Sequence, residues 1–146
     1  MRHASKLIAL PLLVCASLLV AQNAQAEVAS HIPASIHQVT SGGSWSQGKQ
    51  EGFYRAVVTA RGIEHVSHRL YIQWLRVNPQ KQRYELIRTV GVKEINAGHG
   101  QVLSVHTTFG NVNAFRINVT AKTPGGKSRR YVISVRRIGR YSIRSR

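Results

Sequence analysis

The sequence predicts an all-β fold. From Gly52 onward, runs rich in β-branched and aromatic residues are separated by short breaks that contain Gly, Pro or Asn, a pattern typical of strands joined by turns. The breaks recur about every dozen residues, and no window keeps a helical period of about 3.6 residues. We therefore expect a single antiparallel β-sandwich of six to seven strands, with a small β-barrel as the alternative.

The runs give the expected strands directly. Their ranges are 53–60, 66–77, 83–93, 101–109, 113–121 and 128–138. A short strand at 36–40 would be the seventh. Residues 41–48 are rich in Ser, Gly and Gln, so we expect a loop there, within a polar lead-in that spans residues 27–50. The β-sandwich domain would then occupy residues 51–146 and include a basic C-terminal segment.

The first 26 residues have the layout of a secretory leader. Arg2 and Lys6 precede an apolar run over residues 7–21, and the small residues of Ala-Gln-Ala end the segment at Ala26. The run is shorter than the about 20 apolar residues that a membrane-spanning helix needs. We therefore expect residues 1–26 to be a cleaved signal peptide. The mature protein would be periplasmic or secreted, with no transmembrane anchor after cleavage.

Cleavage would also remove Cys15 and Met1, the only sulfur-containing residues of the chain. Disulfides are the usual reinforcement of small secreted domains, so without cysteine the hydrophobic core has to hold the mature domain together. Lipid attachment at Cys15 is disfavoured, because Val14 stands where such a signal has a small residue. The mature chain also has no thiol nucleophile.

Positive charge is concentrated toward the C-terminus. The chain has 21 Lys and Arg but only 5 acidic residues, all glutamates, and the last of them is Glu94. The electrostatic field of so many positive charges attracts polyanions. A high net charge also keeps a small domain soluble. Because no acidic residue follows Glu94 while the bases continue to the end of the sequence, we favour the attraction of polyanions over a role in solubility alone. The expected partner is an anionic polymer or lipid headgroup of the cell envelope, such as lipopolysaccharide or an acidic glycan.

Alternation in the last strands predicts their register. In 113–121 and 128–138 most odd-numbered residues are apolar and most even-numbered residues are polar or basic. Burial of the apolar face fixes the pairing of two such strands. The expected pairs are Phe115 with Val135, Ile117 with Ile133, and Val119 with Tyr131. A three-residue loop at 110–112 would turn Leu103, Val105, Thr107 and Phe109 toward the same core.

The opposite face of these strands is the candidate anion site. Guanidinium groups give paired hydrogen bonds to phosphate, sulfate or carboxylate, and Ser, Asn and His add further donors. The expected site residues are Ser104, His106, Arg116, Asn118, Arg130, Ser134 and Arg136. A secondary basic surface would include Lys122, Lys127, Arg129, Arg137, Arg140 and Arg144. The alternative is that these side chains extend into solvent without a ligand, with 136–146 as a charged edge strand or tail.

We predict no catalytic chemistry, no metal site and no cofactor. His65 and His68 would lie on opposite faces of a strand, and the usual Asp and Cys companions of a metal site are missing from the mature chain. No Gly-x-Ser-x-Gly motif is present. Trp74 is expected in the core, whereas Trp45 is either an exposed binding residue or a lid over one end of the domain.

Two functions remain. The first is an exported, non-catalytic module that docks on a polyanion of the envelope. The alternative is a periplasmic accessory or chaperone-like β-sandwich that binds an exported protein subunit by strand addition. Polyanion docking should weaken as salt rises, whereas strand addition depends on backbone hydrogen bonds and should not.

Overall fold

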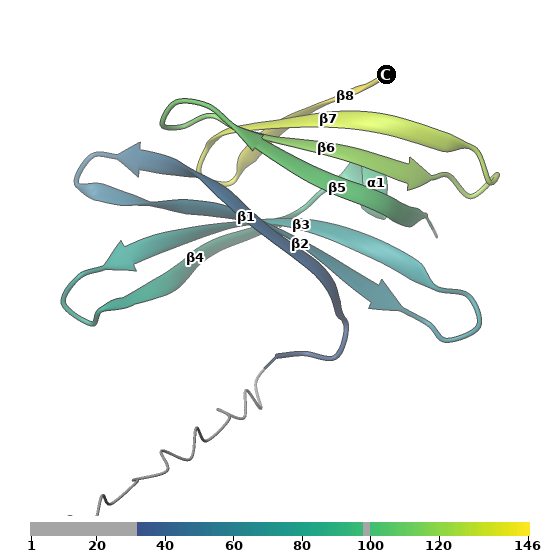
Figure 1. The fold of residues 1–146 in the computed structure, drawn as a ribbon, viewed down its shortest axis with the longest axis horizontal. Coiled ribbons are helices and arrows are strands. Elements are labelled where there is room, and N and C mark those ends of the chain that lie inside the picture. The colour runs from purple at the N-terminus through teal and green to yellow at the C-terminus, as the bar shows by residue number, and fades with distance from the viewer. Residues whose placement is uncertain (1–31, 98–99) are drawn as a thin grey trace, which may run out of the picture. The chain divides into compact units, whose positions relative to one another are not determined.

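The computed structural model describes residues 32–97 and 100–146, so the expected signal peptide lies outside the described residues (Figure 1). Within them the chain forms eight strands and one short helix, α1 (Lys93–Asn96). The strands are β1 (Ile36–Gln47), β2 (Gln50–Arg61), β3 (Ser67–Asn78), β4 (Arg83–Gly91), β5 (Gln101–Phe109), β6 (Phe115–Lys122), β7 (Ser128–Arg137) and β8 (Arg140–Ser145). The all-β class is confirmed, but the expected number of strands was too low.

The strands form two four-stranded antiparallel sheets. Sheet A has the order β1-β2-β3-β4, and sheet B has the order β5-β6-β7-β8. Within each sheet, strands that follow one another in the chain pair with each other, and the segment with α1 links β4 of sheet A to β5 of sheet B. In Figure 1 the blue and teal strands belong to sheet A and the green and yellow strands to sheet B.

The two additional stretches of strand lie in segments of unusual composition. The loop expected at 41–48 is wrong, because β1 continues through the Ser and Gly residues as far as Gln47. Pairing with β2 overrides the low strand propensity of glycine. Gly43, with φ +64°, allows the bulge between Gly42 and Ser44. A Cβ on Gly42 would stand 2.7 Å from the Phe109 ring. The C-terminal segment is also a strand: β8 is the edge of sheet B.

Side chains from both sheets form one hydrophobic cluster. Tyr54 of β2 stacks on Phe115 of β6, with ring centroids 5.1 Å apart and an interplanar angle of 1°. Trp74 is fully buried, as expected. Trp45 is only 2% exposed, and its Nε1 donates a hydrogen bond to the Phe53 carbonyl oxygen at 3.3 Å. The structure thus decides between the two roles expected for Trp45: it covers the core and is not an exposed platform.

The predicted register of β6 and β7 is confirmed for all three apolar pairs. The three-residue loop before β6 is wrong, because Phe109 pairs with Phe115 and leaves five residues between them. This register differs from the expected one by two residues, an even number, so the side chains keep their faces. A bulge between Val102 and Ser104 buries Val102 and leaves Leu103 50% exposed, and Phe109, also expected in the core, is 63% exposed at the end of β5.

His68 joins the two sheets. It is 8% exposed, and its Nδ1 accepts a hydrogen bond of 3.0 Å from the backbone N–H of Val102 in β5. Its own backbone N–H donates to the Gly100 carbonyl oxygen, also at 3.0 Å. The ring stacks on that of His37 with centroids 4.6 Å apart. Nδ1 can accept only while it is unprotonated, so this link requires neutral imidazole.

Protonation of His68 should therefore weaken the fold. Burial and the nearby His37 imidazole lower the pKa of His68, whereas an unfolded histidine titrates near about 6.5. As pH falls through that value the unfolded state binds more protons, and the free energy of unfolding decreases. We expect the urea midpoint to fall between about pH 7.5 and pH 5, and to fall less in His68→Asn, whose amide oxygen can accept from Val102 without titrating.

His65→Asn is the matched control for this experiment. His65 is exposed and lies in the connection between β2 and β3, so this variant should keep the wild-type pH dependence. An equal fall of the midpoint in His68→Asn and in the wild-type protein would contradict the role given to His68.

Candidate functional site

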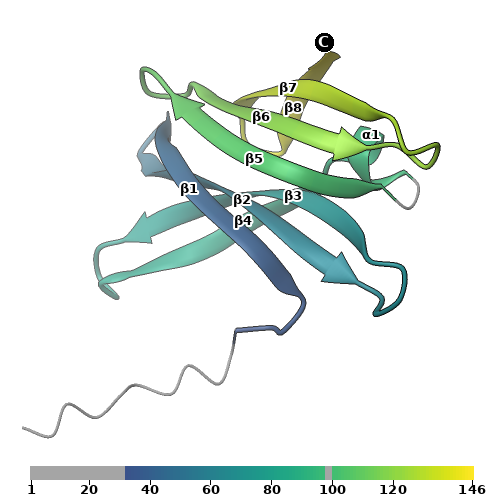
Figure 2. The ribbon, with the colours of Figure 1, turned by 45° about the vertical axis from the view of Figure 1, so that its right-hand side comes forward.

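The outer face of sheet B carries rows of polar and basic side chains. Residues at opposite positions of antiparallel strands share a face, and β5, β6 and β7 lie side by side in Figure 2. From β5 to β8 the rows are Ser104, Thr120 and Arg130; His106, Asn118, Val132 and Arg144; and Thr108, Arg116, Ser134 and Ser142. Arg130, Arg144 and Arg116 thus lie in different rows among smaller side chains, and Arg146, whose backbone N–H donates to the Arg130 carbonyl oxygen at 2.9 Å, follows Arg130 in the first row.

Six of the seven expected site residues lie in these rows. Arg116 and Arg130 are exposed, while Ser104, Asn118 and Ser134 are half-buried between their neighbours. His106 is exposed and lies opposite Asn118, not opposite Arg116 as the shorter loop would have placed it.

Arg136, the seventh residue, lies at the end of this face. It follows Val135, next to the irregularity that ends the regular pairing with β8. Together with Arg116, Ser134 and Thr108 it lines a shallow pocket of about 290 Å³. The structure therefore brings Arg136 close to the last row of the face.

The residues expected to form a secondary basic surface lie in several parts of sheet B. Arg129 pairs with Ala121, whose side chain is buried, so Arg129 lies on the opposite face from Arg130. Lys122 lines a separate pocket at the far end of β6, and Lys127 lies in the turn between β6 and β7. Arg137 and Arg140 form the β7–β8 hairpin.

Some residues of this face were missed from the sequence. Arg144 was expected in the secondary surface, but β8 brings it opposite Val132. Ser142 was missed for the same reason, because the C-terminal segment was not assigned to the sheet. Thr108 and Thr120 alternate with the expected site residues of their own strands, so the spacing of two residues could have found them.

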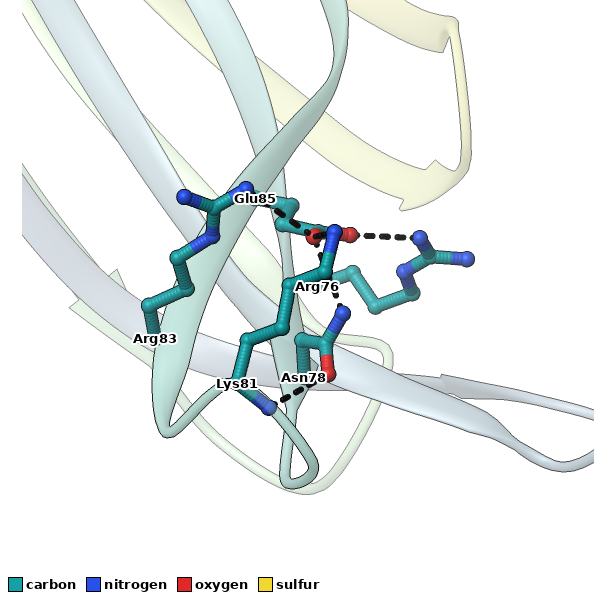
Figure 3. A network of polar contacts seen from close by, with 5 residues as sticks. All are labelled: Arg76, Asn78, Lys81, Arg83 and Glu85. Carbon is teal, nitrogen blue, oxygen red and sulfur yellow. Dashed lines mark hydrogen bonds and ion pairs between the residues drawn. The ribbon is translucent and has the colours of Figure 1, made fainter.

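The ion-paired carboxylate of the described residues lies in sheet A, away from this face. Every ion pair in residues 32–97 and 100–146 involves Glu85, which contacts Arg76 at 2.6 Å, Lys81 at 3.5 Å and Arg83 at 3.7 Å (Figure 3). The hydrogen bond from Arg76, with a second from Asn78, lowers the pKa of Glu85 to about 2. All of these residues belong to sheet A or its β3–β4 turn.

Glu94 also has a partner, because the Tyr141 hydroxyl donates to its Oε2 at 2.8 Å. Among the described residues, no carboxylate forms an ion pair with an arginine of the outer face of sheet B. The guanidinium groups of this face are therefore available to an external anion.

In the part of the chain that the structure describes, no three His, Cys, Asp or Glu side chains gather as a metal site would require, and no helix has the length and hydropathy to cross a membrane. No known family model, curated protein or solved structure matches this chain.

The β7–β8 hairpin sets two like charges against each other, because Arg137 lies directly opposite Arg140. Such pairs destabilise a sheet by roughly 0.2–1 kcal/mol. Arg140→Gln should therefore raise the free energy of unfolding by that order in low salt. The gain should shrink at about 0.5 M salt as screening removes the repulsion. Chemical denaturation at two salt concentrations measures both effects.

Arg144→Gln is the control, since Arg144 lies opposite the neutral Val132. It removes the same charge from the same strand and should change the free energy of unfolding by less than about 0.5 kcal/mol. A loss of stability in Arg140→Gln, or a gain that does not depend on salt, would refute the repulsion.

Proposed function

We propose that this protein is an exported, non-catalytic β-sandwich that docks on an anionic component of the cell envelope through the outer face of sheet B. One observation carries the proposal: arginines on three adjacent strands share this face, and none of them pairs with a carboxylate among the described residues. The leader-like N-terminal sequence favours a partner outside the cytoplasm.

The spacing of the arginines favours a polymer or an array of headgroups over a single small anion. Adjacent strands are about 4.8 Å apart, and residues on one face of a strand repeat about every 6.8 Å. By this geometry the backbones of Arg130 and Arg144 are about 8 Å apart, and those of Arg116 and Arg130 about 14 Å apart. Each arginine can therefore meet a different charged group of a repeating ligand.

The side chains between the arginines suit the same ligand. Ser134, Asn118 and Thr120 are half-buried on this face, and their hydroxyl and amide groups can donate to or accept from glycan hydroxyls. They also separate Arg116, Arg130 and Arg144 from one another on this face. A sulfated or phosphorylated glycan would satisfy both kinds of side chain.

The proposal predicts that Arg116→Ser/Arg130→Ser binds polyanions more weakly. Because this variant removes two charge-assisted hydrogen-bonding groups, the dissociation constant for heparin and for lipopolysaccharide should rise by about tenfold or more near 50 mM salt. Fewer released counterions should also make the salt dependence less steep. The thermal midpoint should change little, because both side chains are exposed.

The matched control is Arg61→Ser/Arg69→Ser, which removes two exposed arginines from sheet A. It lowers the net charge by the same amount and should weaken binding less than about threefold, since it reduces only the long-range attraction. Equal losses of polyanion affinity in both variants would refute specific docking through the outer face of sheet B. Salt-resistant binding to an exported protein, unchanged by the face variant, would refute docking on a polyanion and support strand addition.

A further inference from the structure

Three segments that are far apart in the sequence line a second basic site, a pocket of about 620 Å³. The end of β1, the β5–β6 connection and the β7–β8 hairpin all contribute to its wall. The lining residues are Trp45, Ser46, Gln47, Asn113, Arg136, Arg137, Ile138 and Arg140. The volume lies within the roughly 300–1,000 Å³ of small-molecule sites.

Hydrogen bonds within the protein hold two sides of this pocket in place. Asn113 has φ +64°, and its Oδ1 accepts a hydrogen bond of 2.9 Å from the backbone N–H of Ser46. Its own backbone N–H donates to the Ser44 carbonyl oxygen at 2.8 Å. The buried Trp45 is fixed by its hydrogen bond to Phe53. These contacts need no ligand, so this part of the pocket is preformed.

The third side is strongly positive. Arg136, Arg137 and Arg140 are exposed, and none of them forms an ion pair with a described carboxylate. Arg88 of β4 adds charge behind the hairpin, since its Nε lies 3.5 Å from where a Cβ on Gly139 would stand. Arg137 and Arg140 repel each other across the hairpin, and an anion between them would remove that cost.

We propose that this pocket binds one phosphorylated sugar unit. Arg137 and Arg140 would hold the phosphate through paired, charge-assisted hydrogen bonds. The hydroxyl of Ser46 and the amides of Gln47 and Asn113 would meet the sugar hydroxyls. Phosphate alone would leave these groups unused, and a neutral sugar would leave the arginines unpaired.

This inference deepens the proposed function and rests on it through Arg136, which lines both this pocket and the small pocket at the end of the sheet B face. A glycan lying on the face could place one phosphorylated residue in the pocket. The face would then supply the attraction for polyanions, and the pocket would select among them.

Titration of the isotopically labelled protein, followed by amide chemical shifts, tests this inference. The probes are glucose 6-phosphate, inorganic phosphate and glucose. We expect glucose 6-phosphate to bind with a dissociation constant below about 1 mM, inorganic phosphate to bind at least about tenfold more weakly, and glucose to cause no shifts. The shifts should lie around Ser46, Asn113 and the 136–140 hairpin.

Two variants separate the pocket from the face. Arg137→Ser/Arg140→Ser should weaken glucose 6-phosphate binding by about tenfold or more, whereas Arg116→Ser/Arg130→Ser should leave it within about twofold of the wild-type value. The single variant Arg140→Gln, which relieves the opposed pair, serves as a second pocket variant that should remain folded. It should also weaken glucose 6-phosphate binding.

The outcomes distinguish the two proposals. Equal affinity for inorganic phosphate and glucose 6-phosphate would overturn the assignment of a sugar. If no probe binds while the face variant still has a lower affinity for heparin, the proposed sugar phosphate site is wrong and the proposed function stands. If glucose 6-phosphate binds in the pocket but the face variant keeps its affinity for heparin, the pocket stands and docking through the face is wrong.

Discussion

Burial of one side of β6 and β7 is the constraint on which the rest of the structure depends. Ile117 and Ile133 lie opposite each other and are fully buried, so the alternate residues must face outward. A slip of one residue would drive Arg116 and Arg130 into the core, where each unpaired charge costs several kcal/mol. The packing that stabilises sheet B therefore also holds its arginines together on the exposed face.

The basic side chains of the two sheets differ in whether they have carboxylate partners. In sheet A, Glu85 engages three bases around the β3–β4 turn, so these bases have a carboxylate partner within the protein. Sheet B begins after the last acidic residue of the sequence, Glu94, so its strands contribute no such partner. All five acids precede sheet B in the sequence, and this leaves the arginines on its outer face open to external anions.

The sequence was informative where alternation was strict. The register of β6 and β7 was predicted correctly because β6 alternates apolar and polar residues throughout and β7 places Tyr131, Ile133 and Val135 at every second position. The same reasoning could not find the full length of β1, since its Ser and Gly residues form a strand only through pairing with β2. The pocket at Arg137 and Arg140 was also not predictable, because it needs contacts among segments far apart in the chain. The sequence analysis also grouped Arg129 with the other bases, although its side chain lies on the opposite face of sheet B from Arg130.

Mapping a bound heparin oligosaccharide on the labelled protein by amide chemical shifts tests the central claim most directly, since it locates the ligand without altering the protein. If the outer face of sheet B is the docking surface, the largest shifts lie in β6, β7 and β8 around Arg116, Arg130 and Arg144, and the outer face of sheet A stays unchanged. Shifts centred on sheet A, or spread evenly over every exposed base, would show that the shared arginine face does not direct binding.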